Sequence, residues 1–261
     1  MRANPIFCLI PRGLLAGLIV LSVCGLAHGV TVGNNIVAPN SLAGAEGNTD
    51  LGYPFSVAGT MRYQQVYNAS QFGAIPSGGE LITQIAFRPD GIYGYGFTHT
   101  IGNIQIDLST TAGAPGSLSL TFANNVGVND KTVFNGALTL SSADTGPAGG
   151  PRNFDILIPL ATPFFYNPAA GNLLIDIRNF SDGNSGGTII PELDAAVGAA
   201  SQMGRVWALD ANATAASFPS WQDTVGMVTA FTVAPAPEPA TWALLGLGGF
   251  LVARRGRLSR G

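Results

Sequence analysis

The fold class follows from a short stretch in the middle of the chain, Ile104-Gln105-Ile106-Asp107-Leu108. Apolar and polar residues alternate along it with a period of two, which is typical of a β-strand with one face in a hydrophobic core. Similar runs occur on both sides of it, separated by Gly, Pro, Asn and Asp residues that favour turns. The strands predicted in this way are residues 82–87, 104–108, 118–122, 138–140, 154–158, 173–177, 206–209 and 228–233.

Helical periodicity is weak over the same region. Only residues 193–203 have a pattern that could form one or two helical turns. Many short strands separated by turn residues predict an all-β domain, and we expect an antiparallel β-sandwich of the jelly-roll type with about eight to ten strands. We assign this domain to residues 30–233, a length sufficient for one hydrophobic core.

The N-terminal segment, residues 1–29, has the features of a secretory signal peptide. A region with two arginines precedes apolar residues 13–26, and Ala27-His28-Gly29 places small residues at the −3 and −1 positions. We predict cleavage before Val30. Lipoprotein processing at Cys24 is the alternative, although the residue before that cysteine is not small. Both cysteines lie within this segment, so we expect the mature domain to form no disulfide.

The C-terminus consists of three consecutive parts. A proline-rich linker, residues 234–239, ends in Pro237-Glu238-Pro239; residues 240–253 are apolar and uncharged; and residues 254–261 form a basic tail that starts with Arg254 and Arg255. The apolar part is shorter than the roughly 20 residues that usually cross a bilayer, but basic residues after it suit the cytoplasmic side. We expect a single transmembrane sorting helix at 240–253. The alternative is a buried C-terminal helix of the soluble domain.

These three parts, in this order at the chain end, resemble the PEP-CTERM sorting signal of Gram-negative bacteria that produce polysaccharide. The resemblance implies that Pro237, Glu238 and Pro239 are recognised by an exosortase, a membrane enzyme. It further implies export through the inner membrane, transient anchoring by the C-terminal helix, and then transfer to the cell surface or the extracellular matrix. Glu238 would belong to the substrate motif and would not be a catalyst.

Charge excludes one class of partner. Between residues 30 and 237 the chain has 6 basic and 14 acidic residues, which gives a net charge of −8. A domain of this charge is a poor candidate for binding nucleic acid, because it lacks the basic surface that phosphates require.

The sequence does not support a catalytic site. Gly183-Asn184-Ser185-Gly186-Gly187 resembles the nucleophile loop of chymotrypsin-like proteases, and His99 and Asp155 could complete a triad, but the context of His99 does not fit. A flexible loop is the better interpretation. A glycosidase would need two facing carboxylates, whereas we expect Asp107, Asp155 and Asp176 to point outward from strands, with Asp176 paired to Arg178.

Metal chemistry is restricted in the same way. One histidine and no cysteine in the mature chain cannot supply a transition-metal site. We therefore expect no cofactor, and leave only calcium open, since it needs oxygen ligands alone. The weak calcium candidates are Asp176 with Asp182 and Asn184, and Asn129 with Asp130. Solvated loop residues are the favoured interpretation of both groups.

Aromatic residues are the better indication of binding. Tyr93 and Tyr95 alternate with glycines, followed by Phe97, and Trp221 lies in a polar loop. Exposed rings would suit glycan binding, although rings that fill the core explain the same pattern. We expect a non-enzymatic, exported structural or adhesive protein that contacts exopolysaccharide. The alternative is a carbohydrate-active hydrolase delivered by the same tail.

Overall fold

The computed structural model describes residues 34–57, 59–148, 150–181, 190–198 and 202–236. The chain divides into two units, residues 1–31 and 32–261, and all described residues belong to the second. The expected signal peptide and the tail from residue 237 onward lie outside the described residues. The part of the chain that is described contains no helix of the length and hydropathy needed to cross a membrane.

The described part of the chain is built from antiparallel strands and short 3₁₀ helices. The strands are β1 (Asn34–Ala38), β2 (Thr49–Leu51), β3 (Met61–Tyr67), β4 (Glu80–Phe87), β5 (Phe97–Thr111), β6 (Lys131–Ser142), β7 (Ile156–Tyr166), β8 (Asn172–Asn179), β9 (Leu193–Ala196), β10 (Met203–Ala208), β11 (Gln222–Asp223), β12 (Gly226–Met227) and β13 (Thr229–Pro235). The helices are η1 (Asn40–Leu42), η2 (Ala69–Phe72), η3 (Phe122–Asn125), η4 (Pro168–Ala170) and η5 (Pro219–Trp221).

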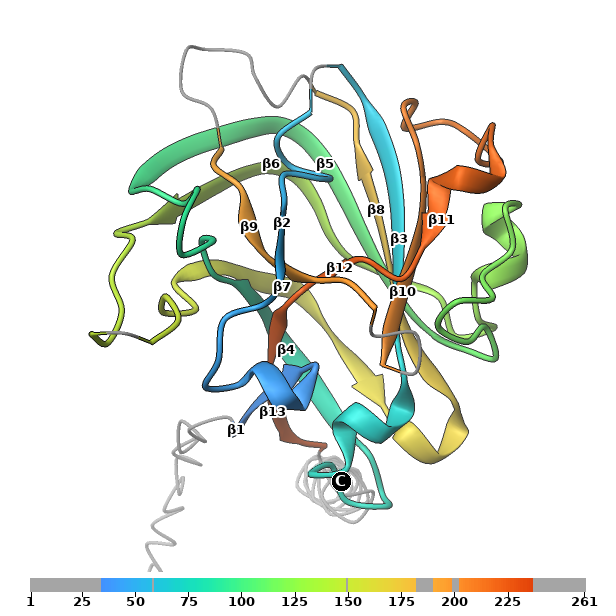
Figure 1. The fold of residues 1–261 in the computed structure, drawn as a ribbon. Coiled ribbons are helices and arrows are strands. Elements are labelled where there is room, and N and C mark those ends of the chain that lie inside the picture. The colour runs from blue at the N-terminus through green and yellow to red at the C-terminus, as the bar shows by residue number, and fades with distance from the viewer. Residues whose placement is uncertain (1–33, 58, 149, 182–189, 199–201, 237–261) are drawn as a thin grey trace, which may run out of the picture. The chain divides into compact units, whose positions relative to one another are not determined.

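Two large sheets form the body of the domain (Figure 1). One has four strands in the order β1-β13-β4-β7, and the other has six in the order β11-β10-β3-β8-β5-β6. A small three-stranded sheet, β12-β9-β2, lies beside them. The chain passes from one large sheet to the other between β3 and β4, β4 and β5, β6 and β7, and β7 and β8. The prediction of an all-β fold with antiparallel sheets is confirmed, and the two large sheets are consistent with the expected sandwich. The described residues form thirteen strands, more than the eight to ten expected.

The main core lies between the two large sheets, where their inward side chains form one cluster. Aromatic rings connect the sheets: Tyr67 of β3 meets Phe231 of β13 edge-on with the ring centroids 5.2 Å apart, and Phe72 of η2 contacts Phe231 at 5.3 Å and Tyr166 at 5.0 Å. Edge-to-face pairs of this kind add to the stabilisation from burial alone.

A second, smaller core lies on the outer face of the six-stranded sheet. Val66 of β3, Leu174 of β8 and Val206 of β10 pack there against Leu118 and Phe122. Two segments cover this face of the sheet: one carries Leu118 and Phe122, and the other is residues 209–216. Backbone hydrogen bonds join the two segments, from Phe122 N to Thr214 O and from Ala216 N to Leu120 O. As a result every residue of β3 is buried, although only one of its faces lies in the sandwich.

Two local predictions are wrong. Residues 118–122 are not a strand of either sheet; they form part of the covering segment and lead into η3, with a single bridge from Thr121 to Ala215. Residues 193–196 form strand β9, not a helical turn, because they pair with β2 and β12. In addition, β13 continues to Pro235, which pairs with Glu80, so the last strand enters the segment expected to be linker.

Candidate functional site

The acidic residues of the central strands are buried, contrary to prediction. Asp176 is 3% exposed and Asp107 is 4% exposed, because the covering segments lie over the outer face where both point. Arg62 pairs with Asp176 through two hydrogen bonds, from Nε to Oδ1 at 3.1 Å and from Nη2 to Oδ2 at 2.6 Å. Gln64 Nε2 donates to Asp176 Oδ2 at 2.8 Å. The expected partner Arg178 is replaced by Arg62 from the neighbouring strand.

The two aspartates are direct cross-strand neighbours, since Asp107 of β5 pairs in register with Asp176 of β8. Asp107 accepts hydrogen bonds from Gln105 Nε2 at both oxygens and from Thr132 Oγ1 at 2.6 Å. Burial, followed by the charges of Asp107 and Asp176, raises the pKa of nearby Asp130. Both buried carboxylates are thus fully engaged by donors of this chain. Their arrangement fits a structural polar network, because a glycosidase needs its carboxylates free to reach a sugar.

The residues of the considered protease triad are not brought together by any described contact. His99 is 6% exposed and its Nε2 has no hydrogen-bond partner. Asp155 instead accepts from Ser142 Oγ at 2.7 Å and from the backbone N of Ala143 at 2.9 Å. Ser185, like Asp182 and Asn184 of one calcium candidate, lies outside the described residues. Of the other candidate, Asn129 is used in hydrogen bonds to Thr110.

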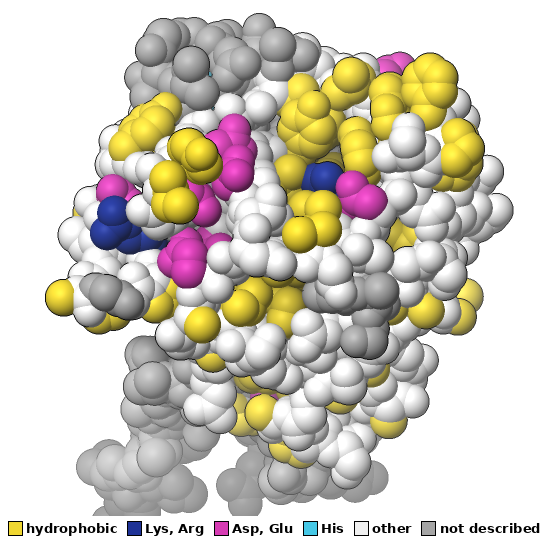
Figure 2. All heavy atoms as spheres, viewed as in Figure 1, with side chains coloured by type: hydrophobic (Ala, Val, Ile, Leu, Met, Phe, Trp, Pro, Cys, Tyr) yellow, Lys and Arg dark blue, Asp and Glu magenta, His cyan; other side chains and the backbone are white. Residues whose placement is uncertain are grey.

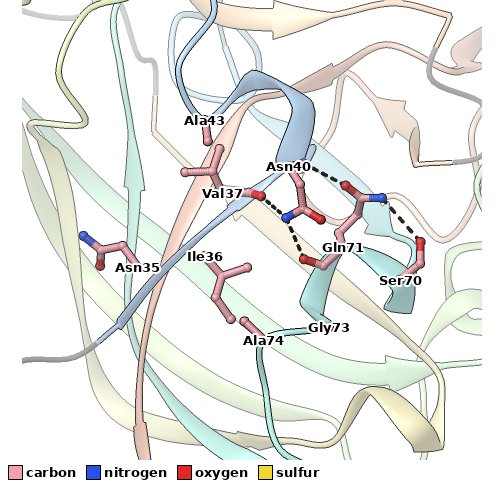
Figure 3. Close-up of a pocket in the computed structure, with 9 residues that line it drawn as sticks. All are labelled: Asn35, Ile36, Val37, Asn40, Ala43, Ser70, Gln71, Gly73 and Ala74. Carbon is pink, nitrogen blue, oxygen red and sulfur yellow. Dashed lines mark hydrogen bonds between the residues drawn. The ribbon is translucent and has the colours of Figure 1, made fainter.

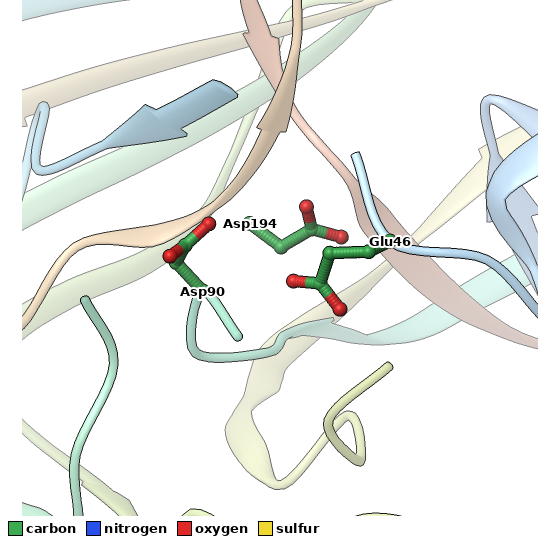
Figure 4. Close-up of side chains that lie close together, drawn as sticks. All are labelled: Glu46, Asp90 and Asp194. Atoms are coloured by element: carbon green, nitrogen blue, oxygen red, sulfur yellow. The ribbon is translucent and has the colours of Figure 1, made fainter. Parts of the chain in front are cut away.

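Three acidic side chains lie close together near the end of β4 (Figure 4), and one of them, Asp194, pairs with Arg88. Glu46, Asp90 and Asp194 come from three separate segments, and each offers one carboxylate oxygen within 4.8 Å of the others. Arg88 is 1% exposed; its Nε donates to Asp194 Oδ2 at 2.7 Å, and its Nη2 reaches the carbonyl oxygen of Leu42 at 3.1 Å. Oxygen ligands of this kind suit calcium, and sequence reasoning missed this group because its members are far apart in the chain.

Most carboxylate oxygens of Glu46, Asp90 and Asp194 already accept hydrogen bonds from groups of this chain. Asp90 Oδ1 accepts from the backbone N of Ile92 and of Tyr93, Asp194 Oδ1 accepts from Gly47 N, and Glu46 Oε1 accepts from Gly91 N. Burial raises the pKa of Asp194 to about 6, with Arg88 acting in the opposite direction. Burial also raises the pKa of Glu192, with further contributions from Asp50 and Asp90. The cluster therefore acts as counter-charge to Arg88 and fixes the loop that carries Tyr93.

A depression between β1, η1 and η2 is lined by uncharged residues (Figure 3). Asn40 lies at its wall and donates from Nδ2 to Val37 O at 2.6 Å and to Gln71 O at 2.8 Å. The side chain of Gln71 in turn accepts from Asn40 N at 2.8 Å. These polar groups hold η1 against η2, and the depression presents no charged group to a ligand.

A row of four aromatic rings lies at the β10–β11 edge of the six-stranded sheet. Tyr53 contacts Trp207 with the centroids 6.4 Å apart, Trp207 and Trp221 lie almost parallel at 6.4 Å with an interplanar angle of 13°, and Phe218 meets Trp221 at 5.1 Å. Phe218 is 55% exposed and the other three rings are partly exposed. We call this set, Tyr53, Trp207, Trp221 and Phe218, the aromatic row.

Charged groups accompany the aromatic row. Arg205 lies with its guanidinium carbon 4.4 Å from the centroid of the Trp207 ring. It pairs with Asp223, from Nε to Oδ1 at 2.8 Å and from Nη2 to Oδ2 at 3.0 Å. Figure 2 shows hydrophobic side chains gathered on this face around a basic and an acidic side chain. The row thus combines apolar rings with an adjacent carboxylate that is one-third exposed.

The predicted aromatic residues occupy two places. Tyr93 is 61% exposed and Tyr95 is 45% exposed, in the loop before β5, whereas Phe97 at the start of β5 is buried. Trp221 lies beside β11, which is four positions from β5 in the sheet order. With neighbouring strands about 4.8 Å apart, that corresponds to roughly 19 Å. Tyr93 and Tyr95 therefore come from a loop that leads into a different strand of the sheet from the one beside Trp221.

The comparison with protein families finds a PEP-CTERM protein-sorting motif at residues 235–257. The chain carries a PEP-CTERM sorting signal. This confirms the resemblance to a PEP-CTERM signal, and the matched segment contains Pro237, Glu238, Pro239, Arg254 and Arg255. The signal implies an exported protein that is processed by an exosortase at a membrane and is then secreted or displayed at the surface.

The PEP-CTERM match covers only the tail, and no curated protein or solved structure matches the chain. The delivered domain must therefore be interpreted from its own residues. Trp221 was predicted as a site residue and Trp207 lies in a predicted strand, but their partnership was not visible in the sequence. It depends on the pairing of β10 with β11, where Arg205 opposes Asp223 and Val206 opposes Gln222; Trp207 and Trp221 are the residues next to the second pair.

Proposed function

We propose that this PEP-CTERM protein is a non-enzymatic structural or adhesive component of the cell surface or exopolysaccharide matrix, and that its described domain binds glycan at the aromatic row. The observation that carries the proposal is the continuous chain of contacts from Tyr53 through Trp207 and Trp221 to Phe218. The sorting signal supports it indirectly, because the resemblance stated above links such signals to bacteria that produce polysaccharide.

The chemistry of the row suits a sugar. A sugar ring has apolar C–H groups on its faces and hydroxyl groups at its rim. Flat aromatic rings supply large apolar contact area with little loss of side-chain entropy, and neighbouring rings offer places for consecutive sugar units. Asp223 lies beside them and can accept hydrogen bonds from hydroxyls, while Arg205 orients its carboxylate.

The test compares the two aromatic surfaces on the same protein. Phe218→Ala and Trp221→Ala should each lower retention on immobilised exopolysaccharide of the producing cells by about twofold to tenfold, and more when combined, since each replacement removes stacking worth roughly 0.5–1.5 kcal/mol. Tyr93→Ala with Tyr95→Ala is the matched control, because it removes two exposed rings elsewhere. Thermal unfolding of each variant checks that the fold is retained.

The outcomes are distinct. Loss of retention only in the Phe218 and Trp221 variants supports the aromatic row. Loss only in the Tyr93 and Tyr95 variant moves the binding site to the loop before β5. Unchanged retention in all variants refutes glycan binding through either surface. Release of reducing sugar from the same polysaccharide would instead support the alternative of a carbohydrate-active hydrolase.

A further inference from the structure

The strands of the four-stranded sheet place no charged side chain on its outer face, and the residues of this face are partly or fully exposed except Ala86 and Ala230, which are 4% exposed. Its edge strand β7 alternates strictly, with Ile156, Ile158 and Phe164 buried in the core while Leu157 and Phe165 on the other face are 45% and 47% exposed. The remaining residues on the outer side of β7 are prolines and an alanine. Soluble domains rarely leave a strand of this composition uncovered unless another molecule packs on it.

The absence of charge continues across the sheet in three rows, of which two cross all four strands and the third crosses β13, β4 and β7. In the first row, Val37, Ala230, Ala86 and Leu157 lie side by side in register. The second row, from Asn35 to Pro159, is polar but uncharged, and Thr232 Oγ1 donates to Asn35 Oδ1 at 2.8 Å.

The third row, Ala234, Leu81 and Phe165, completes the face. We call the face formed by these three rows the neutral face. None of its residues, all of them described, is Asp, Glu, Lys or Arg.

We propose that the neutral face is a self-association surface on which a second copy of this chain packs face to face. The net charge of the domain favours association of two copies through this face. Residues 30–237 have a net charge of −8, so two copies repel each other wherever their acidic surfaces meet. The neutral face is the place where that repulsion is weakest, and its apolar rows match a second copy of themselves. Two sheets packed in this way would resemble the packing already present inside the sandwich.

The geometry favours face-to-face packing over addition of strands at the edge. β7 is the exposed edge of its sheet and contains Pro159 and Pro163, which have no N–H to donate to an incoming strand. The four strands span about 19 Å and average about 26 Å in length, so two faces would bury on the order of 1,000 Å². This area is at the lower limit for a specific interface, and we expect a dimer with micromolar affinity.

The experiment is sedimentation velocity on the protein that producing cells export, over a roughly hundredfold range around micromolar concentration and without polysaccharide. The wild type should convert from monomer to dimer within this range. Leu157→Arg and Phe165→Arg should each keep the protein monomeric, because each places two like charges in the interface. Val128→Arg is the matched control, since Val128 is fully exposed in a loop outside the neutral face and its variant should dimerise as the wild type does.

Three results would overturn the proposal: a wild type that is monomeric at every concentration, a dimer that both arginine variants leave intact, or a dimer that Val128→Arg disrupts equally. If either arginine variant fails to fold, Thr232→Lys replaces it in the test, because it places a charge at a half-buried position on the same face. Because no glycan is present, the result does not depend on the aromatic row.

Discussion

Single buried ion pairs contribute strongly to the stability of this domain. The side chains of Arg62 and Asp176 are 9% and 4% exposed, and their ion pair also involves Gln64. Arg62→Ala leaves the carboxylate of Asp176 buried without its counter-charge, so we expect the free energy of unfolding to fall by about 3–5 kcal/mol. The midpoint of urea unfolding measures this loss.

A surface pair supplies the control for Arg62. Arg152 pairs with Asp144 while 33% and 20% of their side chains remain exposed, so Arg152→Ala should cost under about 1 kcal/mol. Replacing both buried partners, with Arg62→Met and Asp176→Leu together, should recover much of the loss, because no isolated charge then remains. If Arg62→Ala and Arg152→Ala lowered the free energy of unfolding equally, burial of the ion pair would not determine its contribution to stability.

Asp194 makes stability depend on pH in an unusual direction. Burial raises its pKa in the folded protein to about 6, from an ordinary value of 3.8. Between these values the folded state holds a proton that the unfolded state has lost, so stability is greatest at low pH and decreases as pH rises through the window. A difference of about 2 pKa units corresponds to about 3 kcal/mol. The raised pKa of Glu192 acts in the same direction.

We therefore expect the exported protein to unfold at a temperature several degrees higher at pH 5 than at pH 7. Asp194→Asn keeps a neutral side chain at both pH values, as the protonated Asp194 does at pH 5, and should therefore remove most of the difference between them. Asp210→Asn, at an exposed carboxylate, should leave the difference intact. Scanning calorimetry of the three proteins at both pH values provides the measurement, and a wild type less stable at pH 5 would contradict this account.

At the level of elements, alternation predicted the strands of the core but not what covers them. Ile104 to Leu108 lies in β5 as expected, yet Asp107 is buried. Alternation identifies only the face that is apolar. Whether the other face meets water depends on segments distant in sequence, here residues 209–216 and the segment around Phe122. β3 was not predicted because its alternation breaks after Gln64: Gln65 is polar but lies on the side of the sandwich core, and Val66 is apolar but lies in the second core on the outer side.

The failed strand at 118–122 has a local explanation. Leu118 and Phe122 alternate with polar residues as a strand would, but they pack onto the outer face of the six-stranded sheet. Asn125 shapes the segment by accepting from Ser119 N and donating to Ser119 O, which closes it into a loop. Side-chain to backbone bonds of this kind compete with strand pairing and cannot be read from hydrophobic period alone. The aromatic row could not be predicted for a similar reason, because Trp207 and Trp221 come into contact only through the pairing of β10 with β11.

For the whole molecule, sorting and folding are separable along the chain. β13 ends at Pro235, and the PEP-CTERM match begins at that residue, so a cut at Pro237-Glu238-Pro239 leaves every described strand intact. We expect the released protein to unfold at the same temperature as the uncut chain. Replacing the three motif residues with alanine should abolish processing, because the exosortase would lose its recognition sequence while the folded domain is unchanged.

The measurement is the intact mass of the protein in membrane and extracellular fractions of the producing cells. Wild-type protein should be extracellular and end near Pro237, whereas the triple-alanine variant should stay in the membrane fraction with its C-terminus complete. Ser259→Ala, outside the matched segment, should behave as the wild type. Extracellular, shortened triple-alanine protein would mean that another protease acts on the tail. In that case delivery to the matrix, and with it the setting in which the aromatic row would meet polysaccharide, would no longer follow from the motif.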